Sequence, residues 1–208
     1  MKSMRNLICN CCYSGFLYRQ ANSKFDSPFF WNRITCCDFI KLMTHFHDID
    51  FSNLSIKSNK DLYGVDTASC LPTNVSIVLD DFNIRVQFNH YKWSRTDLVP
   101  RKSKINDYVW DIYYYRNYEY AYNKFVERSK RITNDRKIYV FVDNARQFDS
   151  VSDYNNLFIA ARDTGNELYF MTADKTIKCS FPSVHIIYCD RFNFESMTLD
   201  YFDLFESL

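Results

Sequence analysis

Three of the eight cysteines, Cys9, Cys11 and Cys12, lie within four positions near the start of the chain. They follow a short apolar run and precede Ser14, Gly15 and an amphipathic stretch. A cysteine at the start of a helix can act as a nucleophile, because backbone N–H groups and the helix dipole stabilise its thiolate. Cys12 is best placed for this role, and Cys11 is its nearest competitor. The alternative interpretation is that all three are small buried residues, the commonest situation of a free cysteine.

Two other uses of the cysteines are less well supported. Cys9 and Cys12 have the spacing of a redox pair. Such pairs need both sulfurs at the exposed start of a helix, whereas Cys9 falls in the apolar strand before it. Structural zinc uses two spaced pairs of ligands, whereas the adjacent Cys36 and Cys37 would point about a hundred degrees apart on a helix. With three glycines the chain also has no glycine-rich phosphate loop. We therefore expect neither a metal nor a cofactor.

A cysteine nucleophile needs a base, and His90 is the best placed of the four histidines. It ends the strand-like segment "IRVQFNH", where a side chain can emerge at the edge of a sheet. A third group would orient the imidazole. Asp143, which follows the apolar run 138–142, is the best-placed acid, while Asn89 and Asn144 are also chemically suitable. The alternative interpretations are a surface histidine and a turn or helix-capping aspartate.

The hydrophobic periodicity predicts helices interleaved with strands. Helices are expected over 13–21, 36–47, 107–133, 151–161 and 199–205, strands over 6–9, 61–68, 138–142, 167–171 and 184–188, and a β-hairpin over 75–90. Thr35 and Asp38 have the spacing of a capping box at the start of the second helix. This order predicts an α/β fold with a mixed β-sheet sandwiched by helices and an antiparallel hairpin.

The composition limits the organisation and the partners of the chain. Its 208 residues are 47% hydrophobic with only three glycines and four prolines, which favours one α/β domain over 1–208 without a flexible linker. A net charge of +1 gives no field that would attract nucleic acid. No run of 18 apolar residues predicts a transmembrane helix. The dispersed cysteines and the lack of an export signal favour reduced thiols in the cytoplasm.

Four motifs, "NCCYSGFLYRQ", "SPFFWNRITCCDFIKLM", "FNHYK" and "YNKFVERSKRI", carry a resemblance that covers residues 5–145. They resemble an uncharacterised bacterial family described as exopolysaccharide biosynthesis proteins. Its members share an Asn-x-Cys-x-x-Gly-aromatic opening, a Ser-Pro pair, an Asp-Phe-apolar helix and a His-Tyr motif. The layout is also similar to a family of papain-like cysteine peptidases, which has an early cysteine, a Pro-Phe-x-Trp motif and a later histidine. Where the resemblance leads us to expect Gly-Gly after the cysteine, this chain has Ser14–Gly15.

The resemblance implies a Cys–His hydrolase or acyltransferase of exopolysaccharide or capsular polysaccharide biosynthesis, with a papain-like cysteine at a helix start. It favours Cys12 over Cys11 and singles out His90 among the histidines. It also implies an acyl or peptide substrate, or a glycan. Asn10, Gly15 and Ser27 then lie in the substrate-binding region.

Two alternative functions remain open. The chain could be a non-catalytic glycan-binding module, in which Trp31, Tyr91 and Trp93 stack on sugar rings. A glycosyltransferase-type enzyme ranks last, because the sequence has no phosphate loop and no paired-acid metal motif. The basic segment 92–104 is interpreted as a solvated loop, with binding of phosphates or an acidic sugar as its alternative. The sequence does not predict an oligomeric state.

Overall fold

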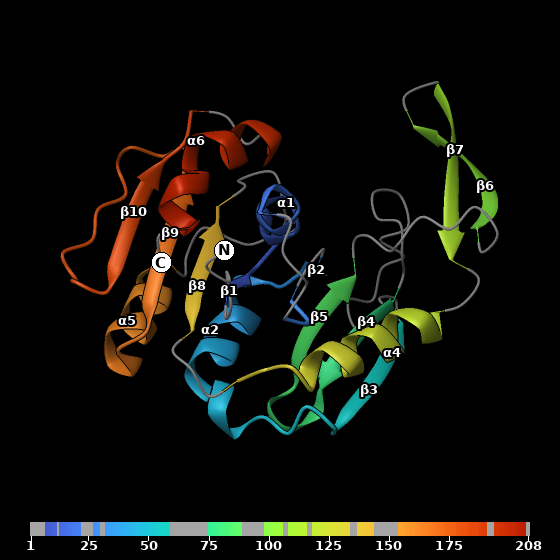
Figure 1. Ribbon diagram of the computed structural model, residues 1–208, viewed down its shortest axis with the longest axis horizontal. Coiled ribbons are helices and arrows are strands. Elements are labelled where there is room, and N and C mark those ends of the chain that lie inside the picture. Colours follow the sequence, from blue (N-terminus) through green and yellow to red (C-terminus); the bar gives the residue numbers. More distant parts are fainter. Residues whose placement is uncertain are drawn as a thin grey trace.

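A computed structural model describes most of the chain as a mixed α/β fold with three sheets (Figure 1). The described residues are 7–11, 13–21, 27–29, 32–58, 75–88, 98–105, 108–115, 118–133, 137–143, 154–190 and 194–206. The predicted α/β class is confirmed. The parallel and antiparallel strands, which we expected in one mixed sheet, form separate sheets.

A four-stranded parallel sheet forms the centre of one half of the molecule. Its strands, in spatial order, are β1 (Leu7–Cys9), β8 (Ile138–Val142), β9 (Glu167–Thr172) and β10 (Val184–Tyr188). Successive side chains of β8 point to opposite faces, so Tyr139 and Phe141 join one hydrophobic core and Val140 and Val142 join another. Both faces of this strand are therefore covered, as expected for a sheet sandwiched by helices.

Helices cover both faces of the parallel sheet (Figure 1). On one face, α1 (Tyr13–Gln20) packs beside α6 (Phe194–Glu206), and on the other α2 (Cys36–His45) packs beside α5 (Tyr154–Thr164). The two cores lie between these helix pairs and the sheet, which gives three layers. No helix in the described part of the chain is long and apolar enough to cross a membrane.

The second sheet is antiparallel and continues the core beneath α2. Its strands, in spatial order, are β2 (Asn32–Arg33), β5 (Ile84–Phe88), β4 (Val75–Leu79) and β3 (Leu54–Ser58). The predicted hairpin is confirmed, and its turn is a short 3₁₀ segment followed by Asn83 in the left-handed conformation, at φ 49°. Helix α4 (Tyr118–Ser129) contributes Phe125 to the same core.

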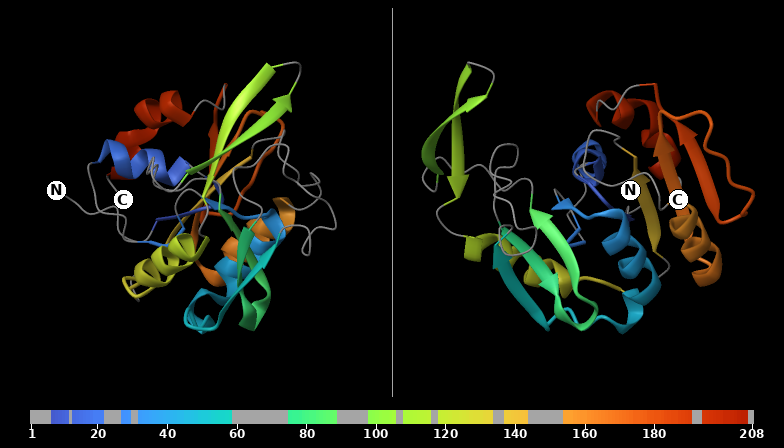
Figure 2. Two further views of the ribbon diagram at one scale, coloured as in Figure 1. Left: turned by 90° about the vertical axis from the view of Figure 1, so that its right-hand side faces the viewer. Right: turned by 180° about the vertical axis from the view of Figure 1, so that it is seen from behind.

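A two-stranded hairpin of β6 (Leu98–Ile105) and β7 (Tyr108–Tyr115) stands apart from the other sheets, as Figure 2 shows from two sides. This hairpin corrects two predictions. The helix expected over 107–133 begins only at Tyr118, because the aromatic and β-branched residues before it pair with β6. Much of the basic segment 92–104, expected as a loop, belongs to β6.

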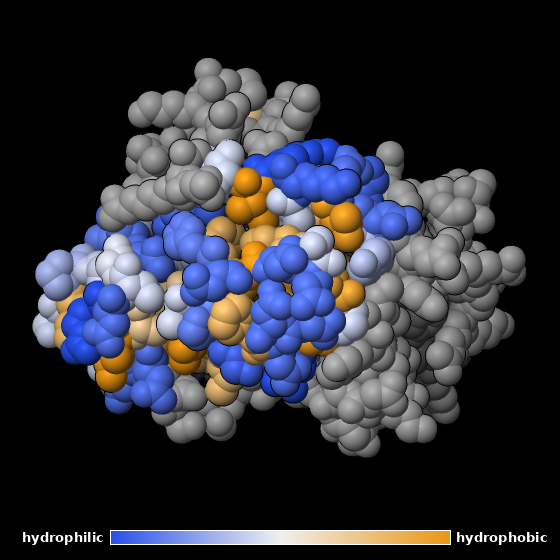
Figure 3. Space-filling view, turned by 90° about the horizontal axis from the view of Figure 1, so that it is seen from below, coloured by the Kyte–Doolittle hydropathy of each residue, from blue (hydrophilic) through white to orange (hydrophobic). Residues whose placement is uncertain are grey.

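The remaining elements follow the sequence with shifted ends. Helix α6 begins five residues earlier than the terminal helix predicted over 199–205, and the strand expected over 61–68 lies outside the described residues. Figure 3 shows the molecule from below, where polar residues surround small hydrophobic patches.

Candidate functional site

The carboxyl ends of the four parallel strands lie at one edge of their sheet, here called the carboxyl edge. The residues that end or follow these strands are Cys9 and Asn10 at β1, Asp143 at β8, Thr172 at β9 and Cys189 at β10, and all five are buried. Open parallel sheets bind their ligands at this edge. The carboxyl edge is therefore the candidate site.

Asn10 joins β1 to β8 through its side chain. Its Nδ2 donates a hydrogen bond to the carbonyl oxygen of Val142 at 3.2 Å, and its Oδ1 accepts one from the N–H of the same residue at 2.8 Å. Its carbonyl oxygen accepts a hydrogen bond from the N–H of Ile34 at 2.8 Å. The fold thus engages both polar atoms of the amide, and substrate binding by Asn10 stays a prediction.

Cys9 and Cys11 form a close pair of thiols at the start of α1. Their sulfur atoms are 3.8 Å apart, and the side chains are 0% and 8% exposed. Burial raises the pKa of Cys9, but hydrogen bonds from the Cys11 thiol and from the backbone N–H groups of Cys11, Ser14 and Asn10 outweigh it, so the pKa of Cys9 is lowered. The hydrogen-bond donors at the start of α1 thus oppose the effect of burial on the pKa of the Cys9 thiol.

Cys9 is fully buried in a hydrophobic core, which confirms for this residue the interpretation of the three cysteines as small buried residues. The hydrogen bonds that its sulfur accepts from the start of the helix were not predicted from the sequence. The signal was present in the spacing of Cys9 and Cys11, because residues two apart at the end of a strand lie on the same face.

Residues 27–29 are held to the start of α1 by Ser14, and Ser27 makes a hydrogen bond within the segment. Ser14 Oγ donates a hydrogen bond to the carbonyl oxygen of Phe29 at 3.1 Å, and Ser27 Oγ accepts one from the N–H of Phe29 at 3.1 Å. Ser27 is buried, and Gly15 is buried within α1. These contacts place Gly15 on the helix that starts at the carboxyl edge and Ser27 in the segment packed against it.

Asp143 links three elements at the carboxyl edge. Its Oδ1 accepts a hydrogen bond from the Tyr154 hydroxyl of α5 at 2.5 Å, and its Oδ2 accepts one from Thr172 Oγ1 of β9 at 2.8 Å. Tyr154 and Thr172, which lie 11 and 29 positions away from Asp143, were not predicted as site residues. No local spacing signals these contacts, because the fold alone brings the three residues together.

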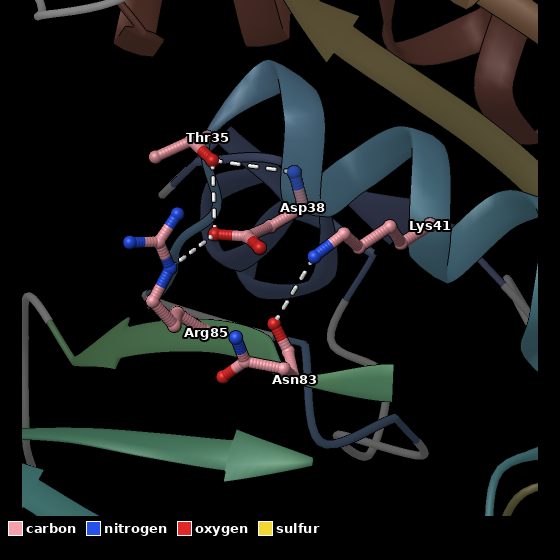
Figure 4. Close-up of polar contacts among 5 residues, drawn as sticks. All are labelled: Thr35, Asp38, Lys41, Asn83 and Arg85. Atoms are coloured by element: carbon pink, nitrogen blue, oxygen red, sulfur yellow. Dashed lines mark hydrogen bonds and ion pairs between the residues drawn. The ribbon is translucent and has the colours of Figure 1, made fainter. Parts of the chain in front are cut away.

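A second buried polar cluster ties α2 to β5 (Figure 4). Asp38 Oδ2 accepts hydrogen bonds from Thr35 Oγ1 and from Arg85 Nε, both at 2.9 Å. Thr35 Oγ1 in turn accepts a hydrogen bond from the N–H of Asp38 at 3.2 Å, which confirms the predicted cap. Among the described residues, Asp38 Oδ1 and Asn32 Oδ1 are buried without a hydrogen-bond partner. An unsatisfied buried acceptor costs about 1–3 kcal/mol.

Residues 32–34 connect the antiparallel sheet to the carboxyl edge. Asn32 pairs with Phe88 at the end of β5, and two residues later the N–H of Ile34 bonds to Asn10. The end of β5 and the end of β1 are therefore held to the same three-residue segment.

Five predicted site residues lie outside the described residues: Cys12, Trp31, His90, Tyr91 and Trp93. The other three histidines are described. His45 ends α2 and stacks on Phe82 with ring centroids 4.3 Å apart, and His47 lies in the 3₁₀ turn that follows. His185 lies on β10 and stacks on Tyr169 with centroids 4.6 Å apart. The predicted pairing of Cys12 with His90 stays a prediction.

No protein-family model matches the chain, and no curated protein matches it. The resemblance to the exopolysaccharide and papain-like families therefore stays a prediction. Within the described part of the chain, no group of three or more His, Cys, Asp or Glu side chains could hold a metal ion. The described residues place thiols, an amide, a carboxylate and hydroxyl groups at the carboxyl edge.

Proposed function

We propose that the protein is a cytoplasmic cysteine hydrolase or acyltransferase of exopolysaccharide or capsular polysaccharide assembly. Cys12 is the nucleophile, His90 is the base and Asp143 orients the imidazole. The observation that carries this proposal is the segment 32–34, which holds the end of β5 to the end of β1. The Cys12 and His90 segments start from these two ends.

The start of α1 supports the nucleophile. Helix α1 begins at Tyr13, directly after Cys12 in the chain. In the same place the pKa of the Cys9 thiol is lowered, although burial raises it, because the Cys11 thiol and backbone N–H groups donate hydrogen bonds to its sulfur. The positive end of a helix dipole lowers the pKa of a thiol beside it, which supports the use of Cys12 as a nucleophile.

Chain connectivity supports the base. His90 follows Phe88 by two residues, and Cys12 follows Asn10 by two residues. Two residues span at most about 7 Å of chain. Because Phe88 and Asn10 are both held by the segment 32–34, this short reach is compatible with a contact between thiol and imidazole.

The position of Asp143 supports its orienting role. It follows Val142, whose backbone is held by the Asn10 side chain. Its oxygens accept hydrogen bonds from Tyr154 and Thr172. An ionised carboxylate offers about four acceptor positions, so Asp143 retains capacity to accept an imidazole N–H.

The proposed reaction proceeds through a thioester. Cys12 thiolate attacks the carbonyl carbon of the substrate, while backbone N–H groups at the start of α1 stabilise the oxyanion. Protonated His90 gives its proton to the leaving group as the carbonyl re-forms. Water or an acceptor hydroxyl then attacks the thioester and gives its proton to His90. Collapse of this second intermediate releases the product and the Cys12 thiolate.

Competitive alkylation tests the proposal. The folded protein is treated with limiting iodoacetamide near neutral pH, and each modified cysteine is located by mass spectrometry. We expect Cys12 to react at least about tenfold faster than Cys37, which is exposed on α2. His90→Ala should remove this advantage, while His47→Ala, at an exposed position, should preserve it.

Two outcomes would overturn the proposal. One is a Cys12 rate no higher than that of Cys37. The other is an unreactive Cys12 together with glycan binding that is unchanged in the Cys12→Ser and His90→Ala variants. That result would favour the non-catalytic module.

A further inference from the structure

Cys9 and Cys11 have the geometry of a dithiol close to bond formation. Their sulfurs are 3.8 Å apart, and a disulfide needs about 2.05 Å, so they must approach by about 1.8 Å. Cys9 is held in the β1–β8 ladder opposite Val140. Cys11 lies between β1 and α1, outside any strand or helix. Cys11 is therefore the residue whose movement can close the bond.

Cys9 and Cys11 differ in their exposure and in their hydrogen bonds. Cys9 is fully buried and Cys11 is 8% exposed, so Cys11 is the more accessible of the two residues. Both pack in the core that contains Val142 and Met171. The hydrogen bonds at the start of α1, which lower the pKa of Cys9 against the effect of burial, increase its thiolate fraction. Cys9 is thus suited to attack a disulfide formed on Cys11.

We infer that Cys9 and Cys11 form a dithiol–disulfide centre that exchanges with low-molecular-weight disulfides of the glutathione class. Cys11 thiolate attacks one sulfur of oxidised glutathione, which forms a mixed disulfide and releases one glutathione thiolate. Cys9 thiolate then attacks Cys11 Sγ, which forms the Cys9–Cys11 bond and releases the second. The two protons lost by the cysteines are taken up by the two glutathione thiolates. The protein dithiol is oxidised and one glutathione disulfide is reduced.

This centre is independent of the proposed enzyme activity, because its chemistry uses neither Cys12 nor His90. The dithiol centre assigns a chemical role to Cys9 and Cys11. Their interpretation as small buried residues gives them none, and the Cys9–Cys12 redox pair leaves Cys11 out. A disulfide removes the Cys9 thiolate as acceptor for the N–H of Ser14, so oxidation changes the hydrogen bonding at the start of α1.

The test uses the full chain in glutathione buffers of increasing oxidised fraction. Remaining thiols are blocked with N-ethylmaleimide, and the peptide that contains all three cysteines is mapped by mass spectrometry. We expect one disulfide between Cys9 and Cys11, with Cys12 carrying the blocking group. In Cys9→Ser, a glutathione adduct should persist on Cys11, because the attacking thiol is missing.

The control variants separate this centre from general oxidation. Cys11→Ser should show neither a disulfide nor an adduct at the buried Cys9, and Cys37→Ser should form the Cys9–Cys11 bond like the unmodified protein. If Cys9→Ser does not fold, as judged by circular dichroism, Cys9→Ala replaces it. A Cys9–Cys12 or Cys11–Cys12 disulfide, or no Cys9–Cys11 bond at any glutathione ratio, would overturn the inference. Alkylation of Cys12 in the reduced protein tests the proposed function separately.

Discussion

Helices α1 and α2 both begin beside two cysteines, yet their first turns are stabilised by different groups. At α2, Thr35 Oγ1 accepts the N–H of Asp38, and the Asp38 carboxylate lies in the first turn. At α1, the N–H of Ser14 donates to the Cys9 sulfur. The first turn of α2 is thus stabilised by the Thr35 hydroxyl and the Asp38 carboxylate, and that of α1 by the Cys9 thiol, whose pKa is lowered.

The spacing of the cysteines explains the difference in their chemistry. Cys9 and Cys11 are two apart at the end of a strand, and their sulfurs meet at 3.8 Å. Cys36 and Cys37 are adjacent on a helix, where side chains diverge by about a hundred degrees. Cys36 is accordingly buried at 3% exposure and Cys37 is exposed. Two cysteines close in sequence form a thiol pair only where the backbone directs both side chains to the same side.

The largest expected effect is at the start of α2, where Arg85→Ala removes the partner of a buried carboxylate. Breaking a buried ion pair costs about 3–5 kcal/mol, and because Arg85 is partly exposed we expect about 3 kcal/mol. Urea denaturation measures this loss in the free energy of unfolding. Lys175→Ala, which breaks an exposed pair with Asp190, should cause no measurable change. Equal losses for the two variants would contradict the importance of burial.

At the start of α1, Ser14→Ala should destabilise the protein by about 1.5 kcal/mol, because it leaves the buried carbonyl of Phe29 without its donor. The same urea measurement applies, and Ser14→Thr, which keeps the hydroxyl, tests whether the hydrogen bond or the side-chain volume matters. Ser14→Ala with unchanged stability would show that the contact to residues 27–29 is unimportant.

Thr35→Ala should cost about 1 kcal/mol, the usual value for loss of a helix cap. Thr35→Ser keeps the hydroxyl that accepts the Asp38 N–H and should retain most of the stability. The comparison between helices predicts that Thr35→Ala leaves the alkylation rates of Cys9 and Cys11 unchanged. A change in those rates would mean that the two helix starts are coupled.

The smallest effect is a pH dependence with opposite signs at two cysteines. The lowered pKa of Cys9 stabilises the fold above the unfolded pKa of about 8.5, and this contribution is lost as pH falls through the folded pKa. Burial raises the pKa of Cys189, so its contribution is present below about 8.5 and is lost as pH rises through the folded pKa.

Urea denaturation measures both effects when it is carried out from about pH 6 to about pH 10, which covers the titration of cysteine. The stability advantage of the unmodified protein over Cys9→Ser should grow with pH. Its advantage over Cys189→Ser should shrink. Slopes of the same sign would contradict the distinction between a thiol at a helix start and one desolvated at the end of β10.

Local patterns were sufficient to predict much of the framework. Short apolar runs predicted β1 and β8, and the spacing of Thr35 and Asp38 predicted the start of α2. The tyrosine-rich stretch before Tyr118 was compatible with a helical period, but pairing with β6 makes it a strand. That pairing is a contact between separate segments, which the periodicity of one segment does not contain.

The candidate site shows the same limit. Its position at the ends of β1 and β8 followed from apolar runs that end in Cys9 and before Asp143. The hydroxyl partners of Asp143 did not, and neither did the ion pair of Asp38 with Arg85, which lies 47 positions away. Such contacts depend on how sheets and helices stack, so only the folded structure reveals them.

The central claim is that Cys12 and His90 meet at the carboxyl edge, and the distance between them tests it most directly. A crystal structure of the protein with an electrophile bound would measure the separation of Cys12 Sγ and the nearer ring nitrogen of His90. We predict a hydrogen-bond distance of about 3–4 Å, allowing for the longer reach of sulfur. A separation of about 10 Å or more, well beyond hydrogen-bond reach, would contradict the proposal.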